Sequence, residues 1–254
     1  GAQKPLIVAG GGVHYSQAAE TLRGFAETFG IPVSETQAGK SAMSWKEPMS
    51  VGAVGVTGTS AANLLASDAD VVLVVGSRLQ DFTTASKQVF DADVKLLHLN
   101  VSKFDGIKMD SIMLQADAKS GLKSLGEQLS KAGFQTSTEY RDRVAKLQTE
   151  WNAEVERLYN LTSKDGNVQT SIVGTLNEFM APEDVVLCAA GSLPGDLHRL
   201  WRSEVPKTYH MEYGFSCMGY EVSGGLGAKM AMEKGEVYVI VGDGSYLMLH
   251  SEIL

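Results

Sequence analysis

The feature that most constrains the fold is a strand-like run, a short turn and a helical run near the end of the sequence. Residues 237–241 are five consecutive apolar, mostly β-branched residues, which predict a strand buried on both faces. Residues 246–254 suit a helix, with Ser245 as a candidate N-cap. The turn between them is glycine-rich, so free backbone N–H groups and a partial positive charge are available there for a phosphate.

An acidic residue, Asp243, stands in this turn between Gly242 and Gly244. A carboxylate beside a phosphate needs a cation between the two anions, and hard oxygen ligands suit Mg²⁺. The alternative is a plain Asp-Gly turn, which favours hairpins, although the residues that follow look helical. The pattern indicates a phosphate site with Asp243 as its metal ligand.

Composition narrows the class of protein. With 254 residues, the chain can form one or two domains with hydrophobic cores. The formal net charge of −8 argues against nucleic acid or an anionic membrane as the main partner. No apolar run approaches the ~20 residues of a membrane span, no signal peptide opens the sequence, and Cys188 and Cys217 lack metal-ligand spacing. A cytoplasmic enzyme is expected, and the abrupt ends suggest a piece of a longer protein.

Strand-like and helix-like segments alternate along the first half of the sequence. This pattern is typical of a parallel sheet covered by helices on both faces. Residues 37–59, rich in Gly, Ser and Thr, predict a long loop. We therefore predict a doubly wound domain over residues 1–135, with strands at 5–9, 31–33, 71–75, 96–99 and 112–114 and helices at 18–29, 61–65 and 118–129.

A long amphipathic helix follows, because Tyr140, Val144, Leu147, Trp151, Val155 and Leu158 share one helical face. We assign residues 136–164 to a helical linker and residues 165–254 to a second α/β unit. That unit is predicted to contain strands at 185–189, 208–211 and 237–241, and helices at 168–179, around His198 and Trp201, and at 220–232. The predicted fold class is α/β, with two doubly wound parallel-sheet domains, the second truncated.

Two further glycine-rich segments could carry chemistry. No G-x-G-x-x-G fits over Gly10-Gly11-Gly12, so a tight strand-to-helix turn is the simpler interpretation. In residues 212–228, Gly214 and Gly219 allow close backbone approach to a flat or bulky group. The alternative for this segment is a plain loop before a tightly packed helix.

Residues 212–228 and Gly242-Asp243-Gly244 together resemble the thiamine-diphosphate enzymes of the pyruvate decarboxylase and acetohydroxyacid synthase superfamily. The resemblance covers the whole chain: residues 1–135 are similar to the central Rossmann-like domain, and residues 165–254 to the first half of the diphosphate-binding domain. In that family an Asn follows Gly-Asp-Gly, and its position here would lie beyond residue 254. Residues 195–201, 212–225 and 242–252 are similar to members that hydrolyse a cyclic 1,2-dione in inositol catabolism.

The resemblance implies roles for individual residues. Asp243 would bind Mg²⁺, and the N–H groups of Gly244 and Ser245 would hold diphosphate oxygens. The Ser216 carbonyl and the Met218 N–H would bond the aminopyrimidine edge, while the Met218 side chain bends the cofactor. His198 would lie at the diphosphate or be a solvated helix histidine, and core filler is the alternative for Met218. The implied cofactor-binding set is Ser192, His198, Ser216, Met218, Gly219, Gly242, Gly244 and Ser245.

The implied activity is thiamine-diphosphate-dependent cleavage of a ring carbon–carbon bond in a small polyol-derived diketone. The activating glutamate of the family belongs to a domain that this sequence lacks, so we expect no catalytic residue here and an inactive fragment. The expected partners are the remaining domains and further copies, in a homodimer or homotetramer. The alternatives are a 2-keto-acid synthase or decarboxylase, or a nucleotide-binding module at Gly10 and Gly76. Arg78 and Asp81 lie where acetohydroxyacid synthase contacts flavin, but their neighbours match poorly, so no flavin is expected.

Overall fold

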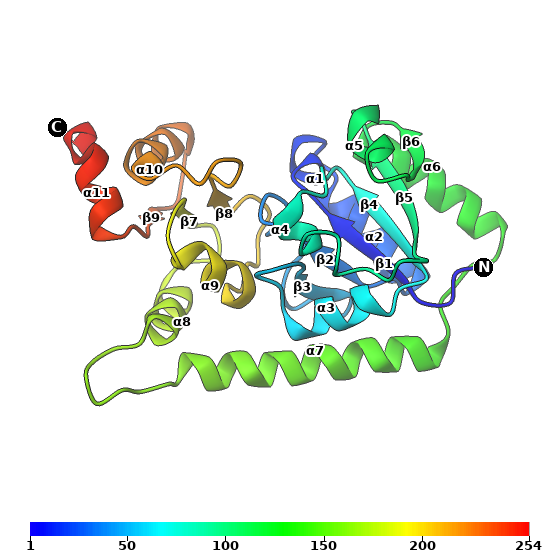
Figure 1. Cartoon of the computed structure of the whole chain (residues 1–254), viewed down its shortest axis with the longest axis horizontal. Helices are drawn as coiled ribbons and strands as arrows, with labels where there is room; N and C mark the ends of the chain where they lie inside the picture. The colour runs from blue at the N-terminus through cyan, green and yellow to red at the C-terminus, as the bar shows by residue number, and fades with distance from the viewer. Residues whose placement is uncertain (254) are drawn as a thin grey trace.

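The protein is described by a computed structural model that covers residues 1–253; Leu254, the end of the predicted last helix, lies outside the described residues. Two parallel sheets form its two parts (Figure 1). The first sheet has the strand order β3-β2-β1-β4-β5-β6, and the second has the order β8-β7-β9. Every strand pair is parallel, which confirms the predicted α/β class.

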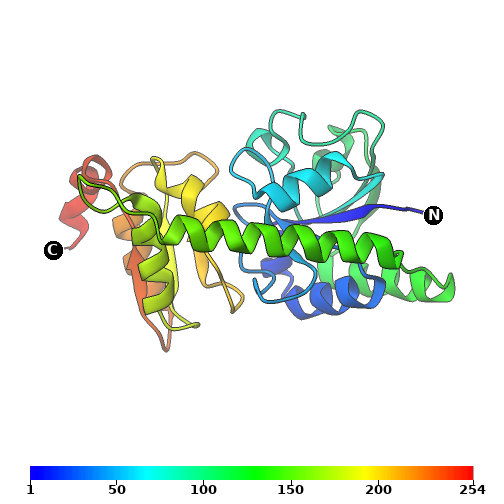
Figure 2. The ribbon, with the colours of Figure 1, turned by 90° about the horizontal axis from the view of Figure 1, so that it is seen from below.

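The first sheet alternates with helices, as predicted, and α2 and α6 cover one face while α3 covers the other (Figure 2). Its strands are β1 (Pro5–Ala9), β2 (Val33–Glu35), β3 (Ser50–Ala53), β4 (Val71–Val75), β5 (Lys95–Asn100) and β6 (Ile112–Gln115). Its helices are α1 (Gly12–Tyr15), α2 (Ala19–Phe29), α3 (Ser60–Ser67), α4 (Asp81–Thr84), α5 (Lys103–Ile107) and α6 (Ala118–Lys131).

The prediction of an unbroken loop over residues 37–59 is wrong, because β3 lies inside it. This strand is short and contains Gly52 at φ +77°, and its register against β2 shifts between Val33 and Ser34. Its sequence carries little strand propensity, so pairing with β2 decides its conformation. The short helices α1, α4 and α5 also escaped prediction, since one turn of helix has almost no periodic signal.

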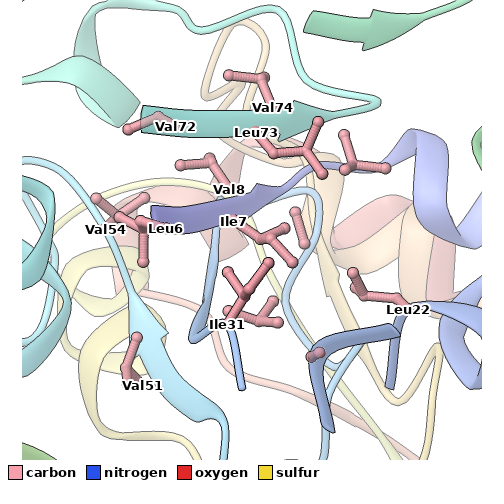
Figure 3. Packing of buried hydrophobic residues seen from close by; sticks show 14 of the residues in the cluster. Leu6, Ile7, Val8, Leu22, Ile31, Val51, Val54, Val72, Leu73 and Val74 are labelled. Atoms are coloured by element: carbon pink, nitrogen blue, oxygen red, sulfur yellow. The ribbon is translucent and has the colours of Figure 1, made fainter. Parts of the chain in front are cut away.

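The core of the first part lies around β1 and β4. All five residues of β1 are buried, as its continuous apolar run predicted. Figure 3 shows Ile7 of β1 pointing toward Ile31, with Leu22 of α2 on the same side. Burying one such side chain contributes about 1.5–3 kcal/mol, so this layer supplies much of the stability. Helix α2 ends where predicted, at Gly30 in the left-handed conformation.

One long helix, α7 (Thr138–Tyr159), connects the two parts. Ser137 caps its N-terminus by accepting a hydrogen bond from the Tyr140 N–H. Tyr140 and Val144 belong to the core of the first part, and Val155 and Tyr159 to the core of the second. Trp151, between them, packs against both cores. Figures 1 and 2 show α7 running along the molecule from one sheet to the other.

The second part is built around a smaller sheet. Its elements are α8 (Gln169–Phe179), β7 (Val185–Cys188), α9 (Leu193–Leu200), β8 (Tyr209–Met211), α10 (Tyr220–Ala231), β9 (Val237–Val239), α11 (Asp243–Leu249) and a 3₁₀ turn (His250–Ile253). Among residues 1–253, no helix combines the length and apolar character needed to cross a membrane.

Two details of the predicted strand–turn–helix are corrected. β9 contains three half-buried residues, not five residues buried on both faces, because it is the last strand described and has a neighbour on one side only. α11 begins at Asp243 with Gly242 as its N-cap, so the prediction of Ser245 as N-cap is wrong. The Ser245 hydroxyl forms hydrogen bonds with Gly219 and Glu221 instead.

The Gly10–Gly12 segment is a tight turn that packs against a second turn after β4. A Cβ on Gly10 would lie 2.4 Å from the Gly76 carbonyl oxygen, and one on Gly12 would lie 2.6 Å from the Gly76 Cα. The Gly12 N–H donates to the Gly76 carbonyl at 2.9 Å. Glycine is therefore required here by the contact between two backbones.

We predict that Gly10→Ala lowers the free energy of unfolding by about 1–3 kcal/mol, because the backbone atoms of Gly76 must move away from the added methyl group. Gly24→Ala is the matched control: no atom lies within 4 Å of its added Cβ on α2. That variant should gain about 0.4–1 kcal/mol from a less flexible unfolded chain. Urea unfolding of the three proteins measures both effects, and equal stabilities would contradict the packing argument.

Candidate functional site

The predicted site residues other than His198 lie on the connections at one edge of the second sheet. β7, β8 and β9 are parallel, so their carboxyl ends lie at the same edge, where ligands bind in open α/β sheets. Three connections leave that edge: residues 189–192 after β7, the 212–219 loop after β8, and the 242–245 turn after β9.

The 212–219 loop is folded around Glu212. Its carboxylate accepts hydrogen bonds from the Phe215 N–H at 3.2 Å and the Cys217 N–H at 2.8 Å. Ser216, at φ +52°, donates its hydroxyl to the Ala189 carbonyl at 3.0 Å. Within residues 1–253, the Ser216 carbonyl and the Met218 N–H form no hydrogen bond. Among the unpaired backbone groups of the loop are therefore an acceptor and a donor two residues apart.

Met218 and Gly219 bring this loop against the 242–245 turn. The Met218 side chain is 47% exposed, and its Cε lies 3.5 Å from the position of a Cβ on Gly244. The core-filler interpretation of Met218 is therefore wrong. Gly219 has φ +93°, and a Cβ there would lie 3.0 Å from the Leu249 Cγ on α11. A side chain at 219 would therefore adopt a strained backbone conformation and press against Leu249.

The 242–245 turn leaves polar groups exposed at the start of α11. Asp243 is exposed, and its Oδ1 accepts a hydrogen bond from the Gly244 N–H at 2.8 Å. The N–H groups of a first helical turn have no partner within the helix. Ser245 is buried; its hydroxyl donates to the Glu221 Oε2 at 2.7 Å and accepts from the Gly219 N–H at 2.7 Å. The Ser245 side chain thus joins the 242–245 turn to Gly219 and Glu221 and is not available to a ligand.

Glu221, in the first turn of α10, is a site residue that the sequence analysis missed. It is fully buried. Its Oε1 accepts from the Ala190 N–H at 3.1 Å, and its Oε2 accepts from the Gly219 N–H at 3.0 Å and from the Ser245 hydroxyl. An acid among the small residues of 221–228 was the available signal, but two of its three partners, Ser245 and Ala190, are 24 and 31 residues away in sequence.

Ser192 and His198 lie on the second part, at α9. Ser192 is exposed at the N-terminal end of α9 and donates its hydroxyl to the Gln169 Oε1 at 3.2 Å. His198 is only 2% exposed, so the interpretation as a solvated histidine is wrong. Its Nε2 lies 3.2 Å from the Glu35 carbonyl, and its Nδ1 lies 2.7 Å from the Thr57 hydroxyl. A contact between His198 and a diphosphate would require one of these two bonds to be exchanged.

Buried polar groups join the first part to α9 and β8 around His198. Gln37 donates to the Pro194 carbonyl at 2.9 Å and accepts from the Tyr209 hydroxyl at 2.7 Å. Burial raises the pKa of Glu35 to about 7 and lowers the pKa of Lys40. The Lys40 ammonium lies 5.7 Å from the centroid of the Tyr209 ring. These contacts fix how the two parts are placed.

An open cleft of about 580 Å³ runs between the two parts beside the 212–219 loop. Phe82 and Tyr213 meet edge to face across it, with ring centroids 5.4 Å apart. On the first part, the wall contains two non-glycine residues with left-handed φ, Leu79 and Lys87, a form of strain that often accompanies function. The cleft gives a small molecule access to Ser216.

The donor groups of this edge fit a flat heterocycle joined to a metal-bound diphosphate. A free carbonyl and N–H match a heterocycle edge, and an open helical turn with one exposed carboxylate matches a phosphate held through a cation. Among residues 1–253, no group of three or more His, Cys, Asp or Glu side chains could hold a metal ion. Asp243 could therefore supply only part of a metal site.

Two family models match the chain and define the class of protein as an α/β enzyme that uses a cofactor. Residues 1–125 match the thiamine pyrophosphate enzyme central domain, and residues 189–254 match the thiamine pyrophosphate enzyme C-terminal TPP binding domain. The chain belongs to the thiamine pyrophosphate enzyme family.

Curated relatives narrow the similarity within this family. The chain is 47% identical to a protein of Clostridium tetani named 3D-(3,5/4)-trihydroxycyclohexane-1,2-dione hydrolase, over 99% of this chain and 43% of the relative. Proteins of the same name from Bacillus cereus and Bacillus thuringiensis are 46% identical over the same shares. The chain thus spans less than half the length of the curated relatives it matches.

The buried His198 generates a prediction on stability against pH. Burial lowers its pKa to about 3, below the unfolded value of 6.5, so the unfolded chain binds the proton more readily. Stability contributed by neutral His198 is present above pH 6.5 and is lost as pH falls toward 3, by up to about 1.4 kcal/mol per pH unit.

His198→Gln removes this titration, so we predict that its free energy of unfolding falls less between pH 6.5 and 4.5 than that of the unsubstituted protein. Glu35, whose raised pKa gives the opposite dependence, is common to both proteins and cancels in the difference. Urea unfolding at a series of pH values measures the two curves. Parallel curves would mean that His198 titrates normally in the folded protein.

Proposed function

We propose that the full-length protein containing this chain is a thiamine-diphosphate- and Mg²⁺-dependent hydrolase that opens the ring of trihydroxycyclohexane-1,2-dione in inositol catabolism. The family matches support the cofactor, and the names of relatives at 46–47% identity support the substrate. The observation that carries the proposal is the free Ser216 carbonyl and Met218 N–H beside the 242–245 turn.

Each site group has a distinct task in this proposal. The Ser216 carbonyl and the Met218 N–H bind the aminopyrimidine edge, and the exposed Met218 side chain supports the space between the two rings. The N–H groups of Gly244 and Ser245 bind diphosphate oxygens, the Gly244 N–H by exchanging its hydrogen bond to the Asp243 Oδ1. The space beside Gly242 is open, since no atom lies within 4 Å of its added Cβ. Gly219 lets the two segments touch.

Thiamine diphosphate, when bound, supplies the nucleophilic carbon and the electron sink for cleavage of a carbon–carbon bond beside a carbonyl. This chain binds and orients the cofactor and balances the negative charge of its diphosphate. Asp243 supplies one oxygen ligand to Mg²⁺, which prefers six, so the remaining ligands come from the diphosphate, water and residues outside 1–253. Acid–base groups for the reaction also lie outside this chain, which by itself is inactive under this proposal.

The experiment that tests the function is an assay of the purified full-length protein with the cyclic dione and with 2-keto acids. The proposal expects ring opening that depends on both thiamine diphosphate and Mg²⁺, and no 2-keto-acid decarboxylation or condensation. Turnover of 2-keto acids in place of the dione would favour the synthase or decarboxylase alternative. Tight binding of NAD or FAD without any thiamine-diphosphate dependence would favour the nucleotide-binding alternative.

The proposal also covers the oligomeric state and the cellular location of the full-length protein. The acidic composition supports a protein that binds neither nucleic acid nor membranes. A cytoplasmic homodimer or homotetramer is proposed, with the other domains of the full-length chain completing the site. Light scattering of the full-length protein tests the assembly.

We predict that Asp243→Asn in the full-length enzyme raises the Mg²⁺ and thiamine-diphosphate concentrations needed for half-maximal activity at least tenfold. Asn keeps the size and one carbonyl oxygen but loses the charge that holds the cation against the diphosphate. Asp165→Asn is the control, since Asp165 is an exposed turn residue away from the 242–245 turn. Saturation curves unchanged by Asp243→Asn, with circular dichroism confirming the fold, would exclude Asp243 as a metal ligand.

We predict that Met218→Ala lowers kcat by about tenfold to a hundredfold while changing the cofactor Kd much less, because misplacing reacting atoms by ~1 Å costs about that much. Met230→Ala, on the exposed face of α10, is the control and removes a side chain that is 79% exposed. Steady-state kinetics at saturating cofactor and calorimetric titration separate the two effects. A wild-type kcat for Met218→Ala would rule out the orienting role.

A further inference from the structure

The buried carboxylate of Glu221 connects all three chain segments at the carboxyl edge of the second sheet. Oε1 accepts from Ala190, directly after β7, at 3.1 Å. Oε2 accepts from Gly219, at the end of the 212–219 loop, at 3.0 Å, and from Ser245, in the 242–245 turn, at 2.7 Å. Moving any one of the three segments relative to the others breaks a hydrogen bond to a fully buried acid.

Three of these atoms form a closed ring of hydrogen bonds. The Gly219 N–H points at both the Ser245 Oγ and the Glu221 Oε2, and the Ser245 hydroxyl donates its single proton to that same Oε2. The hydroxyl thus uses its donor and one acceptor within the ring. Glu221 also stands in the first turn of α10, where a negative charge is favoured by the helix dipole. Both facts explain why a buried carboxylate is tolerated there.

The ring lies directly behind the groups assigned to the cofactor. Gly219 follows Met218, whose N–H forms no hydrogen bond within residues 1–253 and whose side chain is half exposed, and Ser245 follows Gly244 in the 242–245 turn. The ring therefore sets the separation between the group that binds the aminopyrimidine and the groups that bind the diphosphate. A shift at Gly219 would be passed to Met218 through one peptide bond.

We propose that Glu221 is the positioning residue that fixes the 212–219 loop against the 242–245 turn and so holds the two ends of thiamine diphosphate at the reactive separation. This inference rests on the proposed function of the same site. Glu221 itself does not touch the cofactor; it acts through Gly219 and Ser245.

Replacing the carboxylate by an amide breaks this arrangement with almost no change of shape. All three groups that face Glu221 are donors, whereas Gln carries a donating NH₂ on one side. In Glu221→Gln, that NH₂ faces either the Ala190 N–H or the Gly219 N–H and the Ser245 hydroxyl. The hydroxyl can turn to accept, but a backbone N–H cannot, so one backbone hydrogen bond to residue 221 is lost in each orientation.

Glu212 provides a matched comparison on the same loop. It is also a carboxylate that accepts two backbone N–H groups, from Phe215 and Cys217. Both of its partners belong to the 212–219 loop itself, so it shapes that loop without joining it to the turn. Glu212→Gln should disturb the loop, but its effect should be independent of Ser245.

The test is a double-mutant cycle in the full-length enzyme with Glu221→Gln, Ser245→Ala and both together, beside the same cycle with Glu212→Gln. For each protein, the cofactor Kd is measured by calorimetry, the near-ultraviolet circular dichroism of the bound cofactor reports its orientation, and kcat is measured at saturating cofactor. The effects of two substitutions in one hydrogen-bond network are non-additive in free energy, whereas the fold-changes in kcat caused by substitutions at independent sites multiply.

We expect Glu221→Gln and Ser245→Ala each to lower kcat at saturating cofactor by about tenfold or more and to change the dichroism of the bound cofactor. The double variant should be hardly worse than either single one. The Glu212→Gln and Ser245→Ala effects should multiply. Ser245→Thr, which keeps the hydroxyl, should restore most of the activity that Ser245→Ala loses.

The inference is overturned if Glu221→Gln keeps the wild-type kcat and dichroism, or if its effect multiplies with that of Ser245→Ala. If Glu221→Gln fails to fold, the test is the comparison of kcat between Ser245→Ala and Ser245→Thr, and equal values for these two variants overturn the inference. A failure of the proposed function itself looks different, since the unsubstituted protein would then show no thiamine-diphosphate-dependent opening of the cyclic dione, whatever the Glu221 and Ser245 variants do.

Discussion

The structure depends on one helix that is buried in two hydrophobic cores at once. The N-terminal half of α7 packs Tyr140 and Val144 into the first part, and its C-terminal half packs Val155 and Tyr159 into the second. Trp151 is shared by both. Since a helix is stiff over this length, neither sheet can rotate without exposing apolar surface from its own core. The cleft beside Tyr213 and the contacts around His198 exist because α7 holds the two parts in this position.

Helix α7 sets the approximate position of the two parts, and polar contacts between them fix it more closely. Glu35, Lys40 and His198 are buried between the two parts, where burial shifts their pKa values toward neutral forms. Within the second part, a different polar network joins the ends of β7 and β9 to the 212–219 loop through Glu221. Buried polar groups are costly unless they are satisfied, so both networks tolerate few alternative arrangements. The apolar contacts give the fold its stability, and the polar ones give the site its geometry.

Sequence patterns were reliable where one periodicity extended over many residues. The continuous apolar runs of β1 and β4 and the single face of α7 predicted these elements closely, because burial on two faces or on one stripe leaves a direct trace in the sequence. β3 left no such trace, because its residues are extended only through pairing with β2. β9 is shorter and less buried than predicted because it has a neighbour on one side only. The N-cap of α11 was misplaced because a hydroxyl such as Ser245 suits a tertiary contact as well as a cap.

The sequence by itself determined the α/β class, the alternation of strands and helices, and the glycine-containing segments at 212–219 and 242–245, since these follow from local periodicity and backbone freedom. Only the tertiary structure decided which polar groups remain free. Glu212 consumes two N–H groups of its loop and leaves the Ser216 carbonyl and the Met218 N–H unpaired, while Glu221 gathers Ala190, Gly219 and Ser245. Hydrogen bonds between residues far apart in sequence depend on the three-dimensional positions of donors and acceptors, and no local pattern encodes those positions.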